Sequence, residues 1–103
     1  MHFDTYQAKA MSFRKESADN VYALLGLMEE AGEVAGKFSK MRRDGKTDTF
    51  VEDVKKELGD VLWMVAAIAA DLQLHLSDIA EANIVKLDSR KQRNAIGGNG
   101  DNR

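Results

Sequence analysis

The sequence predicts an all-α fold, and three observations lead to that prediction. The 103 residues include no proline, so no ring interrupts a long helix. Apolar residues recur at helical spacing over two long segments. No stretch alternates apolar and polar residues for long enough to favour a β-strand. The length suits one domain, which we assign to residues 1–93, followed by a tail at residues 94–103.

The first two helices are placed by polar residues that can cap their ends. Asp4 is expected to cap the first helix, with Gln7 as the return donor of a capping box, and this helix runs to about Lys15. Ser17 or Asp19 can cap the second helix. The second helix is long and ends at the turn RRDGK, where the glycine stops it.

The third and fourth helices follow from the same kind of signal. Thr49 and Glu52 form a capping box at the start of the third helix, which continues to about Gln73. Ser77 is expected to cap the fourth helix, which runs to about Gln92. The glycine-rich end of the chain then reads as a loop or tail.

The apolar pattern of the two long helices predicts that the chain does not act alone. From Val61 to Ala70 the third helix is apolar on every side, which is typical of burial all round. A four-helix chain of this size has too few helices to surround one of them completely. We therefore expect a helical bundle shared in a homo-oligomer, either a homodimer or a tetramer that is a dimer of dimers. The buried stripe expected on the second helix comprises Leu24, Leu27, Met28, Ala31, Val34, Ala35 and Phe38.

Four carboxylates at helical spacing are the strongest chemical feature of the sequence. Glu30 and Glu33 lie three residues apart and share a face of the second helix, and Glu57 and Asp60 do so on the third. Two such pairs can hold a hard divalent cation, and Mg²⁺ prefers oxygen donors of this kind. A solvated surface is the alternative for the second helix. The third helix favours the cation site, because the face that carries its acids becomes apolar one turn later.

Glycines inside the two acidic helices need an explanation, because each costs about 1 kcal/mol relative to alanine. Gly32 precedes Glu33 and Gly59 precedes Asp60, so we expect them to let the two helices approach closely. Gly26 is expected to leave room for a ligand on the same face.

Several classes of function are disfavoured by the composition. The net charge of −2 gives no broad positive field for nucleic acid, and the longest uncharged run is too short to span a bilayer. The chain has no cysteine and starts without the layout of a secretion signal, which fits the cytoplasm. Neither histidine follows a glutamate by three residues, so the di-iron pattern of helical bundles is missing.

The segments EEAGE and ELGDVLW resemble the two-part motif of the MazG-like nucleoside triphosphate pyrophosphohydrolases. That all-α superfamily also includes the dimeric dUTPases, and the similarity covers most of residues 20–93. The resemblance implies Mg²⁺-dependent hydrolysis of (deoxy)nucleoside triphosphates to the monophosphate and pyrophosphate, with Mn²⁺ as a substitute ion. Removal of non-standard or surplus dNTPs is the expected role. The alternative is a non-catalytic helical module that binds nucleotide or metal, or that only oligomerises.

The resemblance also assigns roles to residues of this sequence. Glu30, Glu33, Glu57 and Asp60 match the metal ligands of the family. Glu29 matches the leading acid of the motif, and either Glu29 or Glu33 is the expected proton acceptor. Asn83, Lys86 and Arg90 match polar positions of the family's last helix and are expected to contact phosphate. Besides this match, Lys37 is expected to help neutralise the leaving group, and the base is expected in a cleft lined by Trp63 or the partner chain and by the first helix, where the candidates are Tyr6, Gln7, Met11 and Phe13.

Overall fold

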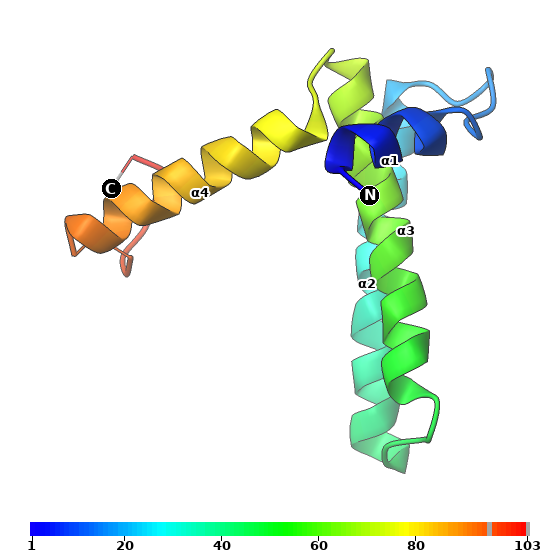
Figure 1. Cartoon of the computed structure of the whole chain (residues 1–103). Helices are drawn as coiled ribbons and strands as arrows, with labels where there is room; N and C mark the ends of the chain where they lie inside the picture. Colours follow the sequence, from blue (N-terminus) through cyan, green and yellow to red (C-terminus); the bar gives the residue numbers. More distant parts are fainter. Residues whose placement is uncertain (95, 103) are drawn as a thin grey trace.

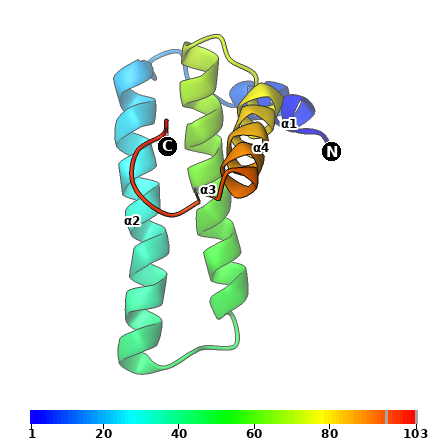
Figure 2. The same cartoon turned by 90° about the vertical axis from the view of Figure 1, so that its left-hand side faces the viewer.

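The computed structural model describes residues 1–94 and 96–102, and all regular structure in that part of the chain is helical (Figure 1). The helices are α1 (Phe3–Met11), α2 (Asn20–Asp44), α3 (Phe50–Asp71) and α4 (Leu76–Gln92). Helices α2 and α3 lie side by side as an antiparallel hairpin in both views (Figures 1 and 2). Helix α1 packs on α3, whereas α4 leads away from the hairpin. The predicted all-α class and the number of helices are confirmed.

No single helix in the described part of the chain is long and apolar enough to cross a membrane. Helices α3 and α4 pass that test only as a pair, and the chain bends by 101° between them.

The capping roles predicted for Asp4 and Ser77 are wrong, because these two residues interact with each other. Helix α1 begins before Asp4, and α4 begins at Leu76. The Asp4 carboxylate accepts hydrogen bonds from the backbone N–H of Ser77 at 3.2 Å and from its hydroxyl at 2.8 Å. These two bonds lower the pKa of the Asp4 carboxyl. Asp4 therefore satisfies a free amide at the start of α4 from 73 residues away.

The hairpin helices follow their predicted ends more closely. Asp19 caps α2, since its carboxylate accepts the N–H of the residue three positions on at 2.9 Å. Gly45 follows the last turn with a φ of +93°, a conformation that favours glycine. The predicted capping box of α3 is wrong: the Thr49 hydroxyl donates to the Asp53 carboxylate at 3.0 Å, and no side chain caps the helix.

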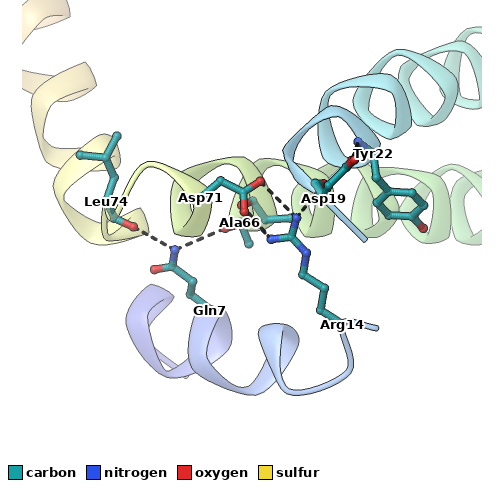
Figure 3. A network of polar contacts seen from close by, with 8 residues as sticks. Gln7, Arg14, Asp19, Tyr22, Ala66, Asp71 and Leu74 are labelled. Atoms are coloured by element: carbon teal, nitrogen blue, oxygen red, sulfur yellow. Dashed lines mark hydrogen bonds and ion pairs between the residues drawn. The ribbon is translucent and has the colours of Figure 1, made fainter. Parts of the chain in front are cut away.

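Gln7 joins α1 to the junction of α3 and α4, which differs from its predicted capping role (Figure 3). Its side-chain amide donates to the carbonyls of Leu74 at 3.0 Å and Ala66 at 3.4 Å. Its carbonyl oxygen accepts the backbone N–H of Leu76 at 3.1 Å. The side chain is buried and its hydrogen-bonding groups are used by the fold.

Arg14 explains why α1 ends at Met11 and does not reach Lys15 as predicted. The chain turns after Met11, and the Arg14 guanidinium then bridges two elements (Figure 3). It forms an ion pair with Asp71 at 2.8 Å, at the end of α3, and donates to the Asp19 carbonyl at 3.0 Å, just before α2. A longer α1 would carry this side chain away from both partners.

The single chain leaves much of its apolar surface uncovered. Its radius of gyration is 16.5 Å, whereas a compact domain of this length has about 13 Å. Its accessible surface is 7937 Å², against about 5,800 Å² for a folded monomer of this mass. The prediction that the α2 stripe is buried is wrong within one chain, because Leu24 is 55% exposed and Met28 70%.

The all-round burial predicted for residues 61–70 is only partly met within one chain. Met64, Ala66, Ala67 and Ala69 are buried, and the other residues of the segment are half-buried. Small side chains therefore make up most of the core, which leaves a monomer with little apolar burial to offset its conformational entropy.

The interpretation of Gly32 and Gly59 as points of close helix approach is wrong for the single chain. A Cβ added at either position meets no atom of the described residues within 4 Å. The close approach occurs at Gly26 instead, where an added Cβ would lie 2.5 Å from the Met64 sulfur. Gly26 thus makes room for Met64 of α3, which differs from the ligand space expected there.

Replacing Gly59 by alanine is expected to stabilise the protein by about 1 kcal/mol, because the helix gains propensity and no clash arises. Gly59 shares an exposed face of α3 with Glu52, Lys55 and Lys56, so the added methyl group points into solvent. Urea denaturation of the wild type and Gly59→Ala measures the change. A loss of stability would show that another group packs against this glycine.

Candidate metal and nucleotide site

The acidic cluster consists of Glu30 from α2 with Glu57 and Asp60 from α3. Each residue offers a carboxylate oxygen, and the three oxygens lie within 4.8 Å of one another. The antiparallel pairing of α2 and α3 brings these residues together, because the acidic segment of one helix lies beside that of the other. Glu30 and Glu57 are half-buried, and Asp60 is exposed. The structure therefore groups three of the four predicted ligands, while Glu33 is exposed and lies outside the group.

The electrostatics of the acidic cluster favour a bound cation. Burial raises the pKa of the Glu30 carboxyl, and the charges of Asp60, Glu29, Glu57 and Glu33 raise it further, in that order. Within the described part of the chain, no lysine or arginine forms an ion pair with Glu30, Glu57 or Asp60, so these like charges lie together without a cationic partner. A hard divalent ion would neutralise this charge, and carboxylate oxygens are the donors that it prefers.

An open pocket of about 510 Å³ includes part of the acidic cluster. Glu30 and Asp60 line it together with three aromatic residues, Phe13, Tyr22 and Trp63. We call it the aromatic pocket. Its remaining lining residues are Arg14, Lys15, Ser17, Ala18 and Met64.

Of the residues expected to contact the base, Phe13 lines the aromatic pocket and so does Trp63. Its indole N–H donates to the Ala10 carbonyl at 3.1 Å, which fixes the ring against α1. Tyr22 and Lys15 are pocket residues that the sequence did not single out. Lys15 lies in the irregular segment between α1 and α2, so no helical spacing links it to the acids. Tyr22 lies on α2 seven residues before Glu29 and eight before Glu30, a spacing that places it on the acid-bearing side of the helix and is the signal that could have identified it.

The other predicted substrate contacts lie elsewhere in the chain. Gln7 lines a separate hollow beside His75, and its side chain is hydrogen-bonded to the backbone of Leu74 and Leu76. Lys37 lies about two turns beyond Glu30 and lines a third hollow near the α2–α3 connection. The predicted contacts on α4 are not brought to the acidic cluster of the same chain, because α4 leads away from the hairpin (Figure 1). They are Asn83, Lys86 and Arg90.

Fold and site together define an all-helical protein with a candidate cation site that opens onto an aromatic pocket. A family model described as the MazG nucleotide pyrophosphohydrolase domain matches residues 18–94, which include α2, α3 and α4. The chain therefore belongs to the MazG family, and the resemblance seen in its acidic motifs is confirmed. Membership supports activity as a nucleotide pyrophosphohydrolase, which is a hydrolase, and the family is typically metal-dependent.

A phage protein is similar to the chain along its whole length. The chain is 40% identical to the Gene 37 protein of Mycobacterium phage L5, over an alignment of 114 residues that covers all of both proteins. No solved structure matches the chain significantly.

Proposed function

We propose that the protein hydrolyses (deoxy)nucleoside triphosphates to the monophosphate and pyrophosphate with Mg²⁺, and that Mn²⁺ can replace Mg²⁺. The observation that carries this proposal is the acidic cluster, whose three oxygens lie within 4.8 Å of one another beside the aromatic pocket. A role in removing non-standard or surplus dNTPs fits a small cytoplasmic enzyme. We assign it no nucleic-acid or membrane partner, on the basis of its net charge of −2 and its short apolar runs.

Glu30, Glu57 and Asp60 would hold the cation. A bound divalent cation supplies charge neutralisation for the phosphates and lowers the pKa of a water that attacks phosphorus. The half-buried position of Glu30 and Glu57 limits competition from bulk water for this ion. Glu33, on the same helix as Glu30, is the proposed fourth ligand or the proton acceptor, and Glu29 is the other candidate for the acceptor.

The aromatic pocket is the proposed place for the nucleoside. Phe13, Tyr22 and Trp63 present apolar ring surface, which suits the flat face of a base. Lys15 lines the same pocket and offers a positive charge for a phosphate. A nucleoside there would leave its phosphates beside Glu30 and Asp60. A bound cation would then be needed to neutralise the repulsion between the phosphates and these carboxylates.

We further propose that a second copy of the chain completes the site in a homodimer or a dimer of dimers. The chain exposes about 2,100 Å² more surface than expected for a compact monomer, which is the scale that an obligate partner covers. Asn83, Lys86 and Arg90 lie on α4, which has few neighbours within its own chain. Docking of α4 on a partner's hairpin would supply these groups, and Lys37 nearby, to a triphosphate.

A pyrophosphate-release assay over a panel of dNTPs, with Mg²⁺, with Mn²⁺ and with chelator, tests the enzymatic proposal. We expect equimolar monophosphate and pyrophosphate in the presence of metal and none with chelator. The alternative is a helical module that binds nucleotide or metal without turnover. Binding of dNTP without release of pyrophosphate at any metal concentration would favour that alternative.

Millimolar Mg²⁺ is expected to raise the melting temperature, and more so at about pH 7.5 than at about pH 5. Without the ion, the raised pKa of Glu30 means that the folded state binds a proton more readily than the unfolded state. The contribution of Glu30 to stability therefore falls as pH rises through the window between its ordinary and its raised pKa. Mg²⁺ competes with that proton, so its effect grows as the carboxyl ionises.

Differential scanning fluorimetry at both pH values measures this prediction. Glu30→Gln is the matched variant, since it removes the charge at nearly constant volume. We expect it to melt at an equal or higher temperature than the wild type without metal and to respond little to Mg²⁺. A wild-type melting temperature that does not change over the millimolar range would argue against the cation site.

A further inference from the structure

The glycine-rich tail folds back on α4 and contacts two of its basic side chains, Lys86 and Arg90. Figure 1 shows the tail, in red, beside the last turns of the helix. The Asp101 carboxylate lies 3.2 Å from the Lys86 ammonium and 3.3 Å from the Arg90 guanidinium. The same guanidinium donates to the Asp101 carbonyl at 2.7 Å and to the Gly100 carbonyl at 3.4 Å. We call this set of contacts the tail strap.

The tail strap changes the exposure of α4 at these two residues. In the segment 81–90 every residue is exposed except Lys86, which is half-buried, and Arg90, which is only 4% exposed. Arg90 is long and charged and stands far along a helix that projects from the hairpin, so burial there is unusual. Its contacts with Gly100 and Asp101 account for the burial.

We propose that the tail strap is an autoinhibitory contact, in which Asp101 and the neighbouring carbonyls occupy the cations that bind the substrate phosphates. The inference rests on the proposed function, since it takes Lys86 and Arg90 as phosphate contacts. The carboxylate is the chemical mimic of a phosphate here, because its charged Oδ1 atom accepts from both the Lys86 ammonium and the Arg90 guanidinium. Substrate must displace the tail strap before its phosphates reach Lys86 and Arg90.

The strength of the tail strap suits a contact that substrate can open. Hydrogen bonds from Lys86 and then Arg90 lower the pKa of Asp101, so its carboxylate is charged at neutral pH. Its side chain is 82% exposed, and exposed ion pairs are weak because water screens them. The strap persists because the tail is tethered close by, which gives it a high effective concentration.

A triphosphate has two advantages over the tail strap. It carries several negative charges, whereas Asp101 carries one. It also has more acceptor oxygens, and the Arg90 Nε atom under the tail strap is buried without a hydrogen-bond partner among the described residues. A phosphate that replaces the tail strap can accept a hydrogen bond from this donor. Substrate at sufficient concentration therefore displaces the tail from Lys86 and Arg90.

Asp101→Asn, and deletion of residues 95–103, are expected to tighten binding of inorganic tripolyphosphate by about two- to fivefold, the range that loss of an exposed ion pair allows. Isothermal titration calorimetry of the full-length wild type and both variants measures this. The KM for the best dNTP should fall by the same factor with kcat unchanged. Asp88→Asn is the matched control, because it removes a charge from α4 without touching the tail strap.

The two proposals fail in different ways. Equal tripolyphosphate affinity in the wild type, Asp101→Asn and the deletion overturns the autoinhibitory role, even where dNTP hydrolysis is robust. Weaker binding by the deletion overturns it too, because the tail would then help to hold phosphate. Absence of hydrolysis in every variant, with tripolyphosphate affinity still rising on removal of Asp101, overturns the enzymatic proposal and leaves the tail as a competitor for polyphosphate.

Discussion

Glu57→Gln is expected to lower pyrophosphate release by about 100- to 1000-fold, the range seen when one group that stabilises a developing charge is removed. Glu57 supplies one of three carboxylates in the acidic cluster, and its amide analogue keeps the volume but binds a divalent ion poorly. Helix content should stay unchanged. Without metal, the melting temperature should be equal or higher, because one source of repulsion toward Glu30 has gone.

Steady-state kinetics at saturating Mg²⁺ measure the rate of pyrophosphate release. Circular dichroism measures the helix content and the melting temperature. Glu52→Gln is the matched control: it makes the same chemical change on α3, five residues away, on the exposed face that carries Lys55 and Lys56. We expect the control to keep wild-type activity. Equal activity in both variants would mean that the acidic cluster is an ordinary charged surface.

The grouping of the acids could be predicted because it depends on local rules alone. Spacing by three residues puts two acids on one helix face, and the short connection after Gly45 forces α2 and α3 to be antiparallel neighbours. Those two facts bring Glu30 to Glu57 and Asp60. The position of Glu33 depends on the exact rotation of α2 against α3, which the contact between Gly26 and Met64 influences and which residue spacing does not specify.

The capping residues predicted for α1 and α4 were wrong for the opposite reason, because their partners are distant in sequence. Asp4 fits the local rule for a cap of α1, but the fold uses its carboxylate to accept hydrogen bonds from Ser77 at the start of α4. Gln7 likewise satisfies backbone groups where α3 meets α4. A rule that examines four consecutive residues cannot choose between a local partner and one that tertiary packing brings close.

The aromatic pocket was only partly predictable, since the segment between α1 and α2 has no periodicity. Lys15 lines the pocket because of the turn that Arg14 fixes through Asp71 and Asp19.

Apolar spacing also identified a stripe on α2 correctly as an apolar surface, but spacing does not say which chain covers it.

Met28→Glu is expected to dissociate the oligomer and to lower the melting temperature by about 10 °C or more. Met28 is 70% exposed in one chain, and Leu24 and Leu25 beside it are 55% and 61% exposed. A patch of this kind is buried by a partner in the proposed assembly, so a charge at its centre loses its hydration without gaining a counterion. A cost of about 3 kcal/mol or more is typical of that mechanism and corresponds to this shift for a domain of about 100 residues.

Sedimentation velocity and thermal unfolding at several protein concentrations measure the effect. Lys56→Glu is the control, because it also introduces a glutamate into a hairpin helix but on the exposed polar face of α3. The wild type and the control should sediment as the same oligomer, with melting temperatures that rise with concentration. Met28→Glu should also lose dNTP hydrolysis, because α4 of one chain could no longer reach the acidic cluster of its partner. A wild type that is a stable monomer, or a Met28→Glu variant that remains oligomeric and active, would contradict a site shared between two chains.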